Sequence, residues 1–135
     1  MKTLSEAIWN TFNTSVELKA LLTGGFHYGC AVQGSVLPYG VYTIRQTTNE
    51  NTFLKKIDGV PIQMNLYTKS TTSSSDCFDV YETCLELYEN LVLTVSDSYD
   101  VTLIKIMGIP PMSVTGGTKW MAVIEFNVLL QKREV

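Results

Sequence analysis

Residues that form reactive or metal-binding sites are scarce in this sequence of 135 residues. It contains one histidine and three cysteines, with no Cys-x-x-Cys pair and no spacing typical of a zinc site. An odd number of cysteines argues against a disulfide framework. The sequence therefore predicts no enzymatic activity, no cofactor and no bound metal.

Charged residues are also few, at 17% of the chain, against an average of about 25% in globular domains. Ten Lys and Arg residues against thirteen Asp and Glu residues give a net charge of −3, and no run of five basic residues is present. This excludes the basic surface that nucleic-acid-binding proteins present. A low charge content suits a protein whose faces are covered by partner proteins.

Long apolar segments are missing as well. No apolar run approaches the roughly 18 residues that cross a bilayer, and residues 1–6 lack the apolar segment of a secretion signal. We therefore expect a protein that is made in the cytoplasm and has no membrane partner. Because 45% of its residues are hydrophobic, residues 1–135 are expected to form a single domain with its own core.

The sequence does contain two helical patterns, and the first lies at its start. Thr3 and Glu6 match a capping box, which predicts that a helix begins there. Apolar residues then recur at four-residue spacing: Leu4, Ile8, Phe12 and Val16. The polar residues 13–15 predict a kink or a restart, and the short helix that follows is expected to end before a left-handed Gly24 or Gly25.

The second helical pattern is the clearest in the chain and begins in the Ser- and Asp-rich residues 73–76. Its apolar face is predicted from Cys77, Val80, Tyr81, Cys84, Leu87, Tyr88 and Leu91. Its opposite face carries Asp79, Glu82, Glu86 and Glu89, which we expect to face solvent or a partner rather than a metal pair. Cys77 and Cys84 lie about 10 Å apart along such a helix, so they are predicted to be buried and unbonded.

Strand patterns occupy most of the remaining chain. Residues 38–45 and 60–68 predict an antiparallel pair, and residues 101–107 and 120–131 predict two further strands. Pro110-Pro111 and Gly116-Gly117, which lie between the last two, are typical of a stiff connector and a turn. The order α-β-β-α-β-β predicts an α+β fold, with an antiparallel β-sheet of about four strands packed on two main helices.

His27 and Cys30 are the one close pair that could provide a thiol nucleophile and its base. A catalytic pair needs the base within hydrogen-bond reach and a third group that orients it, and spacing in a glycine-rich segment supplies neither. The favoured interpretation is a histidine without a catalytic role. A small thiol-dependent enzyme that uses Cys30 and His27 is kept as the less favoured alternative.

Several segments occur in the order found in one family of phage proteins. Residues 20–25 (ALLTGG) end the first helical region, residues 31–34 (AVQG) and 37–42 (LPYGVY) follow, and residues 62–67 (IQMNLY) lead to the helix at 76–91 and the strand at 120–130. The chain thus resembles, over nearly its whole length, the tail completion proteins of long-tailed phages and prophages. These are also called tail terminators or tail-to-head joining proteins.

The resemblance implies a structural role and no catalysis. Such proteins form a ring, commonly sixfold, on the end of the tail tube, stop its growth and present a surface to the head–tail connector. The expected partners are therefore further copies of this chain, the tail tube protein and the connector protein, with DNA only passing through the lumen. The expected place is the virion tail, after synthesis in the bacterial host cytoplasm. A neck or head-completion protein that contacts the portal is the alternative.

Two sets of residues are predicted to make these contacts. One is a polar loop between the first two strands, longer than a tight hairpin needs: Thr48, Asn49, Glu50, Asn51, Thr52 and Phe53. The other consists of apolar residues on the side of the last strand that the main core does not use: Met121, Val123 and Leu129. Exposed apolar surface of this kind usually marks an interface.

Overall fold

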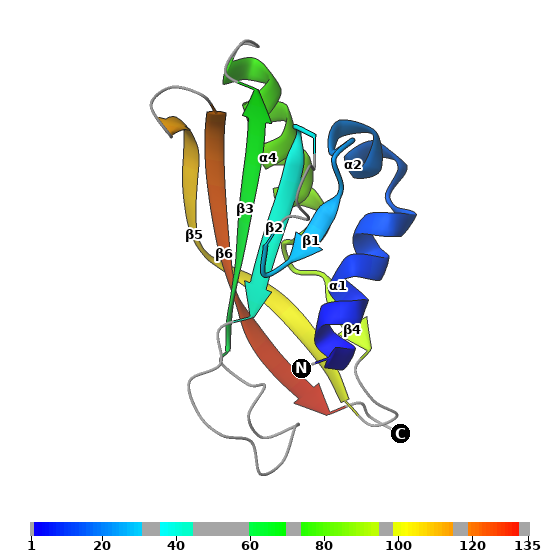
Figure 1. Cartoon of the computed structure of the whole chain (residues 1–135). Coiled ribbons are helices and arrows are strands. Elements are labelled where there is room, and N and C mark those ends of the chain that lie inside the picture. Colours follow the sequence, from blue (N-terminus) through cyan, green and yellow to red (C-terminus); the bar gives the residue numbers. More distant parts are fainter. Residues whose placement is uncertain are drawn as a thin grey trace.

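A computed structural model describes residues 2–30, 36–44, 60–69, 74–94, 99–114 and 119–132. Three helices and six strands lie within these ranges (Figure 1). In chain order they are α1 (Lys2–Thr14), α2 (Val16–Leu21), β1 (Phe26–Tyr28), β2 (Tyr39–Ile44), β3 (Pro61–Lys69), α4 (Ser74–Tyr88), β4 (Val92–Thr94), β5 (Tyr99–Val114) and β6 (Lys119–Lys132). Among these residues, no helix is long and apolar enough to cross a membrane.

The six strands form one sheet in the order β1-β2-β3-β6-β5-β4. Neighbouring strands are antiparallel except β1 and β2, which are parallel. The sheet is strongly bent, so its two edge strands curve toward each other on the side where the helices lie (Figure 1). Helix α1 lies at this open side and contacts both β1 and β4.

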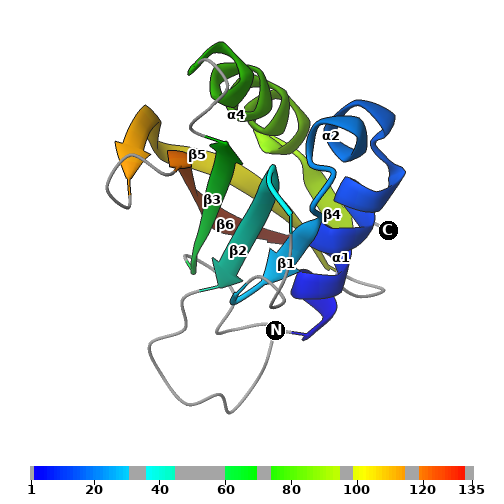
Figure 2. The same cartoon turned by 45° about the horizontal axis from the view of Figure 1, so that its top comes forward.

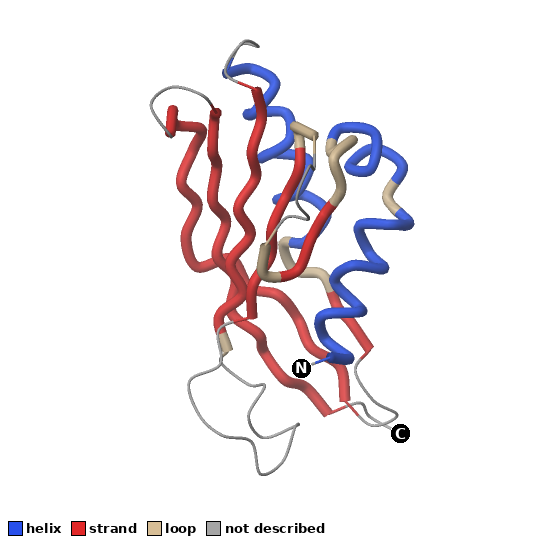
Figure 3. Tube along the Cα trace, in the orientation of Figure 1, coloured by secondary structure: helices blue, strands red, loops and turns tan. Residues whose placement is uncertain are grey.

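The first helical region breaks where the sequence predicts a restart. Helix α1 ends at Thr14, and the Ser15 hydroxyl caps α2 by accepting a hydrogen bond from the Leu18 backbone N–H at 3.3 Å. Figure 3 shows this break as a short tan segment between two blue helices. Gly25 has a φ of +96°, which confirms the predicted left-handed glycine after α2.

All three helices pack on the concave face of the sheet (Figure 2). The core between them includes Leu4 and Ile8 of α1, Cys77, Val80 and Cys84 of α4, Ile62, Met64 and Leu66 of β3, and Ala122, Ile124, Phe126 and Val128 of β6. This confirms the predicted inward faces of residues 60–68 and 120–131. The Tyr88 hydroxyl donates a hydrogen bond to the Ile8 carbonyl at 2.8 Å, so it fixes α1 against α4.

The predicted four-stranded antiparallel sheet on two helices is wrong, because the sheet has six strands and one parallel pair. Strands β1 and β4 were not predicted, since three residues are too few to show an alternating pattern. Tertiary contacts determine them instead. Phe26 of β1 is buried and its ring stacks on that of Tyr42 with centroids 4.7 Å apart. Strand β4 pairs with the start of β5.

Strand β5 is the other correction, because it extends well beyond the predicted residues 101–107. It includes Pro110-Pro111, which the sequence predicted to be a connector. The β5–β6 register shifts between Ile109 and Met112, so the prolines occupy a bulge, where a missing N–H breaks no regular ladder bond. Beyond Leu103, the opposite edge of β5 pairs with no strand among the described residues.

Candidate assembly interface

His27 makes structural contacts within its own segment and with Tyr39. Its Nε2 atom lies 2.8 Å from the Gly24 carbonyl oxygen, and because a carbonyl can only accept, Nε2 donates this hydrogen bond. The imidazole also meets the Tyr39 ring edge-on, with centroids 6.3 Å apart. Cys30 is exposed and lines a different hollow from His27. The two residues therefore do not form the nucleophile–base pair that a thiol enzyme requires.

The other two thiols are buried in the core. Cys77 and Cys84 are both free, which confirms that they are buried and not bonded to each other. Burial raises the pKa of Cys84 to about 12. Burial also raises the pKa of Cys77. Since the thiolate is the nucleophilic form, neither residue is a nucleophile at neutral pH.

Three of the acidic residues on the outer face of α4 line a groove on the helical side of the molecule. Asp79, Glu82, Glu86 and Glu89 are exposed, as the sequence predicts. No group of three or more His, Cys, Asp or Glu side chains that could hold a metal occurs in the described part of the chain. The groove lies between α2 and α4 and has a volume of about 430 Å³. We call it the acidic groove, lined by Glu17, Ala20, Leu21, Asp79, Glu82, Thr83 and Glu86.

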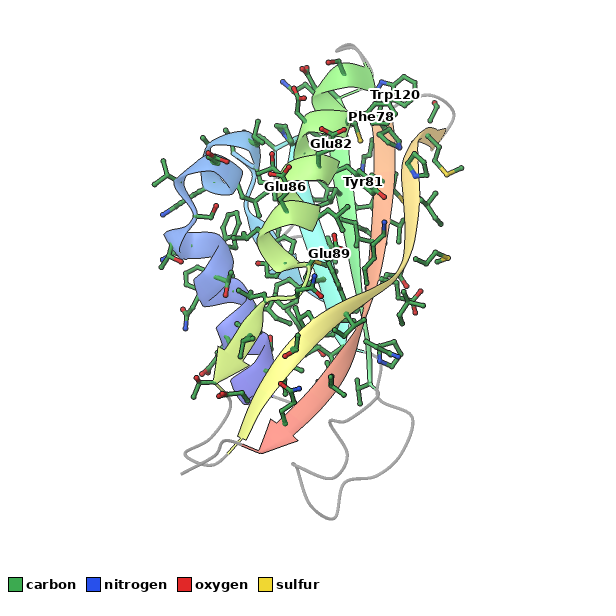
Figure 4. All side chains as sticks on the ribbon, turned by 180° about the vertical axis from the view of Figure 1, so that it is seen from behind. Phe78, Tyr81, Glu82, Glu86, Glu89 and Trp120 are labelled. Atoms are coloured by element: carbon green, nitrogen blue, oxygen red, sulfur yellow. The ribbon has the colours of Figure 1, made fainter. Side chains whose placement is uncertain are left out.

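Aromatic residues lie on the other flank of α4, toward β5 and β6 (Figure 4). Phe78 is exposed, whereas Trp120 is half-buried against the core. The Tyr81 hydroxyl approaches Gly108 of β5 so closely that a Cβ atom at that position would overlap it. Glycine at position 108 therefore allows α4 to pack closely against β5.

The convex face of the sheet carries the predicted apolar contact residues of β6, and the three differ in exposure. Leu129 is 43% exposed and Met121 is half-buried. Val123 is only 5% exposed, although it lies outside the main core cluster. It pairs with Asn65 on one side and Ile109 on the other. Met121 and Leu129 are thus available to a partner, and Val123 is almost covered.

Strand β5 extends this apolar surface, because residues paired directly across an antiparallel ladder share a face. Met112 pairs with Met121, and Ile104 and Met107 pair with Asn127 and Glu125. Ile104, Met107 and Met112 are 38%, 43% and 46% exposed. We call this surface the outer stripe, formed by Ile104, Met107, Met112, Met121 and Leu129.

Next to the outer stripe, three strands bring together a cluster that the sequence did not reveal. The Lys119 ammonium of β6 donates a hydrogen bond to the Tyr39 hydroxyl of β2 at 3.0 Å. It also lies 5.5 Å from the ring centroids of both Tyr39 and Tyr67 of β3, within the range of a cation–π contact. We call Tyr39, Tyr67 and Lys119 the lysine–tyrosine corner. Lys69 pairs directly opposite Lys119, so two positive charges lie at this end of the sheet.

The remaining predicted contact residues, Thr48, Asn49, Glu50, Asn51, Thr52 and Phe53, lie outside the residues that the structure describes. So does the predicted Gly116-Gly117 turn. The lysine–tyrosine corner could have been found only with the strand register, because its members lie 28 and 52 residues apart in the sequence. Its one sequence signal is that each member lies one residue from an end of a predicted strand (38–45, 60–68 or 120–131).

Comparisons with known proteins agree on the fold. No protein-family model and no curated protein matches the chain. Among solved structures, it is similar to a chain described as "Virion of native gene transfer agent (GTA) particle", with a TM-score of 0.67 and 12% identity over 96% of this chain and 95% of that one. A second solved chain, without a functional description, gives a TM-score of 0.63 and 14% identity over 97% and 98%. At such identities the likeness shows a shared fold.

Proposed function

We propose that this protein is a structural component of a phage-like virion. The observation that carries the proposal is the fold likeness to a chain of a gene transfer agent virion, which extends over 96% of this chain and 95% of that one. The resemblance of the sequence to tail completion proteins is independent support, because it rests on residues rather than on shape. The described site geometry adds no reactive pair that would favour a thiol enzyme.

Within the virion, we assign the protein to the end of the tail tube. There it caps the tube as a ring, in the proposed form a hexamer, and offers its other surface to the head–tail connector. The exposed apolar outer stripe supports such a contact role, since contiguous apolar surface on a protein usually marks an interface. Residues 48–53, with Met121, Val123 and Leu129, are the proposed contact residues, although Val123 is only 5% exposed.

The two faces of the subunit differ, and this favours a ring over a twofold dimer. The helical side carries the acidic groove and the convex side carries the outer stripe. A contact between two different surfaces is head-to-tail, and it produces a ring if the rotation closes. A ring with the same rotational symmetry as the tail tube can cap the end of that tube.

Electron microscopy of purified tail tubes mixed with the protein tests this function. We expect added density at one end of each tube and an arrest of tube growth. A Met112→Ser, Leu129→Ser variant, altered only on the exposed outer stripe, is expected to fold normally and bind tubes more weakly. Tubes that keep growing, with bare ends, would contradict the tail role. Density on isolated portal complexes instead would support the neck alternative.

A further inference from the structure

Two surfaces of opposite charge lie on opposite sides of the subunit. The acidic groove opens on the helical side, between α2 and α4, whereas the lysine–tyrosine corner lies on the convex side of the sheet. We propose that the acidic groove receives the lysine–tyrosine corner of a neighbouring copy of this chain. The inference rests on the proposed ring and names the surfaces that form its subunit contact.

The groove combines acidic and apolar side chains. Four carboxylates line it, from Glu17 of α2 and from Asp79, Glu82 and Glu86 of α4. The apolar side chains of Ala20 and Leu21 also line it. Carboxylates beside apolar side chains complement a cation that is attached to an apolar or aromatic surface.

The lysine–tyrosine corner is a surface of that kind. Lys119 presents one ammonium group held by the Tyr39 hydroxyl and by two aromatic rings. Met121 lies directly opposite Tyr67 in the β3–β6 ladder, so apolar surface continues from the corner into the outer stripe. The contacts already restrict the lysine side chain, which lowers the entropy that association would otherwise cost.

Their placement selects a second copy arranged head to tail. In a twofold dimer each surface would have to meet its complement across one interface. Here the helices that form the groove lie on one side of the sheet (Figures 1 and 4), and the corner residues lie on its other face. One copy can therefore fill the groove of the next while leaving its own groove open for a third. This is the repeat that closes into a ring.

Charge exchange between the surfaces tests the contact. Glu86→Lys alone and Lys119→Glu alone each place like charges in every contact, so we expect each variant to lose self-association by at least about tenfold. An equal mixture of the two variants restores opposite charges in every contact of an alternating ring. The mixture is therefore expected to recover most of the association. Sedimentation velocity, with and without tail tubes, measures the association of each single variant and of the mixture.

A matched control lies on the same helix. Glu89 is exposed on α4 but does not line the groove, so Glu89→Lys is expected to leave association unchanged. Single variants that associate like the unmodified chain, or a mixture that recovers nothing, would overturn the inference. The unmodified protein could still form rings on tubes when the single variants associate normally or the mixture recovers nothing. In that case the proposed ring is retained and only the assigned surfaces are wrong. If it forms no ring at all, the proposed function fails too.

A cross-link gives a second measurement that does not depend on charge. In a Cys30→Ser background, the pair Ala20→Cys, in the groove, and Met121→Cys, beside the corner, keeps Glu86 and Lys119 and should join neighbouring copies into a ladder of covalent multimers on oxidation. Either cysteine alone should give dimers at most. Absence of multimers beyond dimers, at concentrations where the unmodified chain associates, contradicts the contact.

Discussion

The two faces of strand β6 differ in what covers them. On the concave side, Ala122, Ile124 and Phe126 are completely buried beneath the helices. On the convex side, Asn127 and Leu129 of the same strand are exposed. The helices cover one face only, so one face stabilises the subunit while Asn127 and Leu129 on the other remain exposed. Substitutions on alternate residues of this strand should therefore affect different properties.

The largest expected difference in stability is between the variants Phe126→Ala and Leu129→Ala, whose positions lie three residues apart on β6. Phe126 is fully buried, so its truncation leaves a cavity and should lower the free energy of unfolding by about 3–5 kcal/mol. Leu129 is 43% exposed, and its truncation should change the free energy of unfolding by no more than about 0.5 kcal/mol. Urea denaturation of both variants measures this. Equal losses would mean that the convex face also contributes to the core.

An effect of intermediate size is expected in how the free energy of unfolding depends on pH, and it distinguishes the buried thiols from the exposed one. Burial raises the pKa of Cys84 from 9.0 to about 12, so the folded state keeps its proton to higher pH than the unfolded chain. The free energy of unfolding should therefore fall as pH rises above about 9, by up to about 1.4 kcal/mol per pH unit. Below that pH, Cys84 should contribute no pH dependence, because both states are protonated.

Urea denaturation between pH 8 and 10 measures this slope. Cys84→Ala should reduce it and leave the part due to Cys77, whose pKa burial also raises. Cys30→Ser, which alters an exposed thiol, is the control. The range stops at pH 10 because burial also raises the pKa values of Tyr42 and Tyr88. Their own contributions to the loss of stability begin above their ordinary value of 10.0. An unchanged slope in Cys84→Ala would contradict the assignment to this thiol.

A smaller loss of stability than that of Phe126→Ala is expected from Lys119→Met on the convex side. The substitution removes one hydrogen bond and two cation–π contacts, yet the site is only half-buried. The free energy of unfolding should fall by about 1 kcal/mol or less. Thermal unfolding measures it, with Lys105→Met of exposed β5 as the matched control. A loss comparable to that of Phe126→Ala would make the corner part of the folding core.

The long periodic segments of the fold could be predicted from the sequence. Helix α4 and the inward faces of β3 and β6 follow from apolar residues at regular spacing, and each buries the predicted side. The restart at Ser15 also follows, because a hydroxyl before a helix supplies its missing acceptor. In these segments the local pattern and the tertiary environment require the same structure.

Other parts could not be predicted because they depend on contacts between distant residues. Phe26 belongs to a strand only because Tyr42 and the parallel neighbour β2 lie beside it. Pro110-Pro111 enter β5 because the register shifts there. The lysine–tyrosine corner requires three strands in one register, and no single segment contains that information.

The position of α1 has a consequence for the order in which the chain folds. This helix is synthesised first, yet it contacts β4, and the Ile8 carbonyl is bonded to a tyrosine 80 residues later. During synthesis, α1 therefore cannot make these contacts until α4 and β4 have left the ribosome. Contacts over such sequence separations slow folding, so the docking of the earliest segment is expected to be among the last events in forming the native subunit.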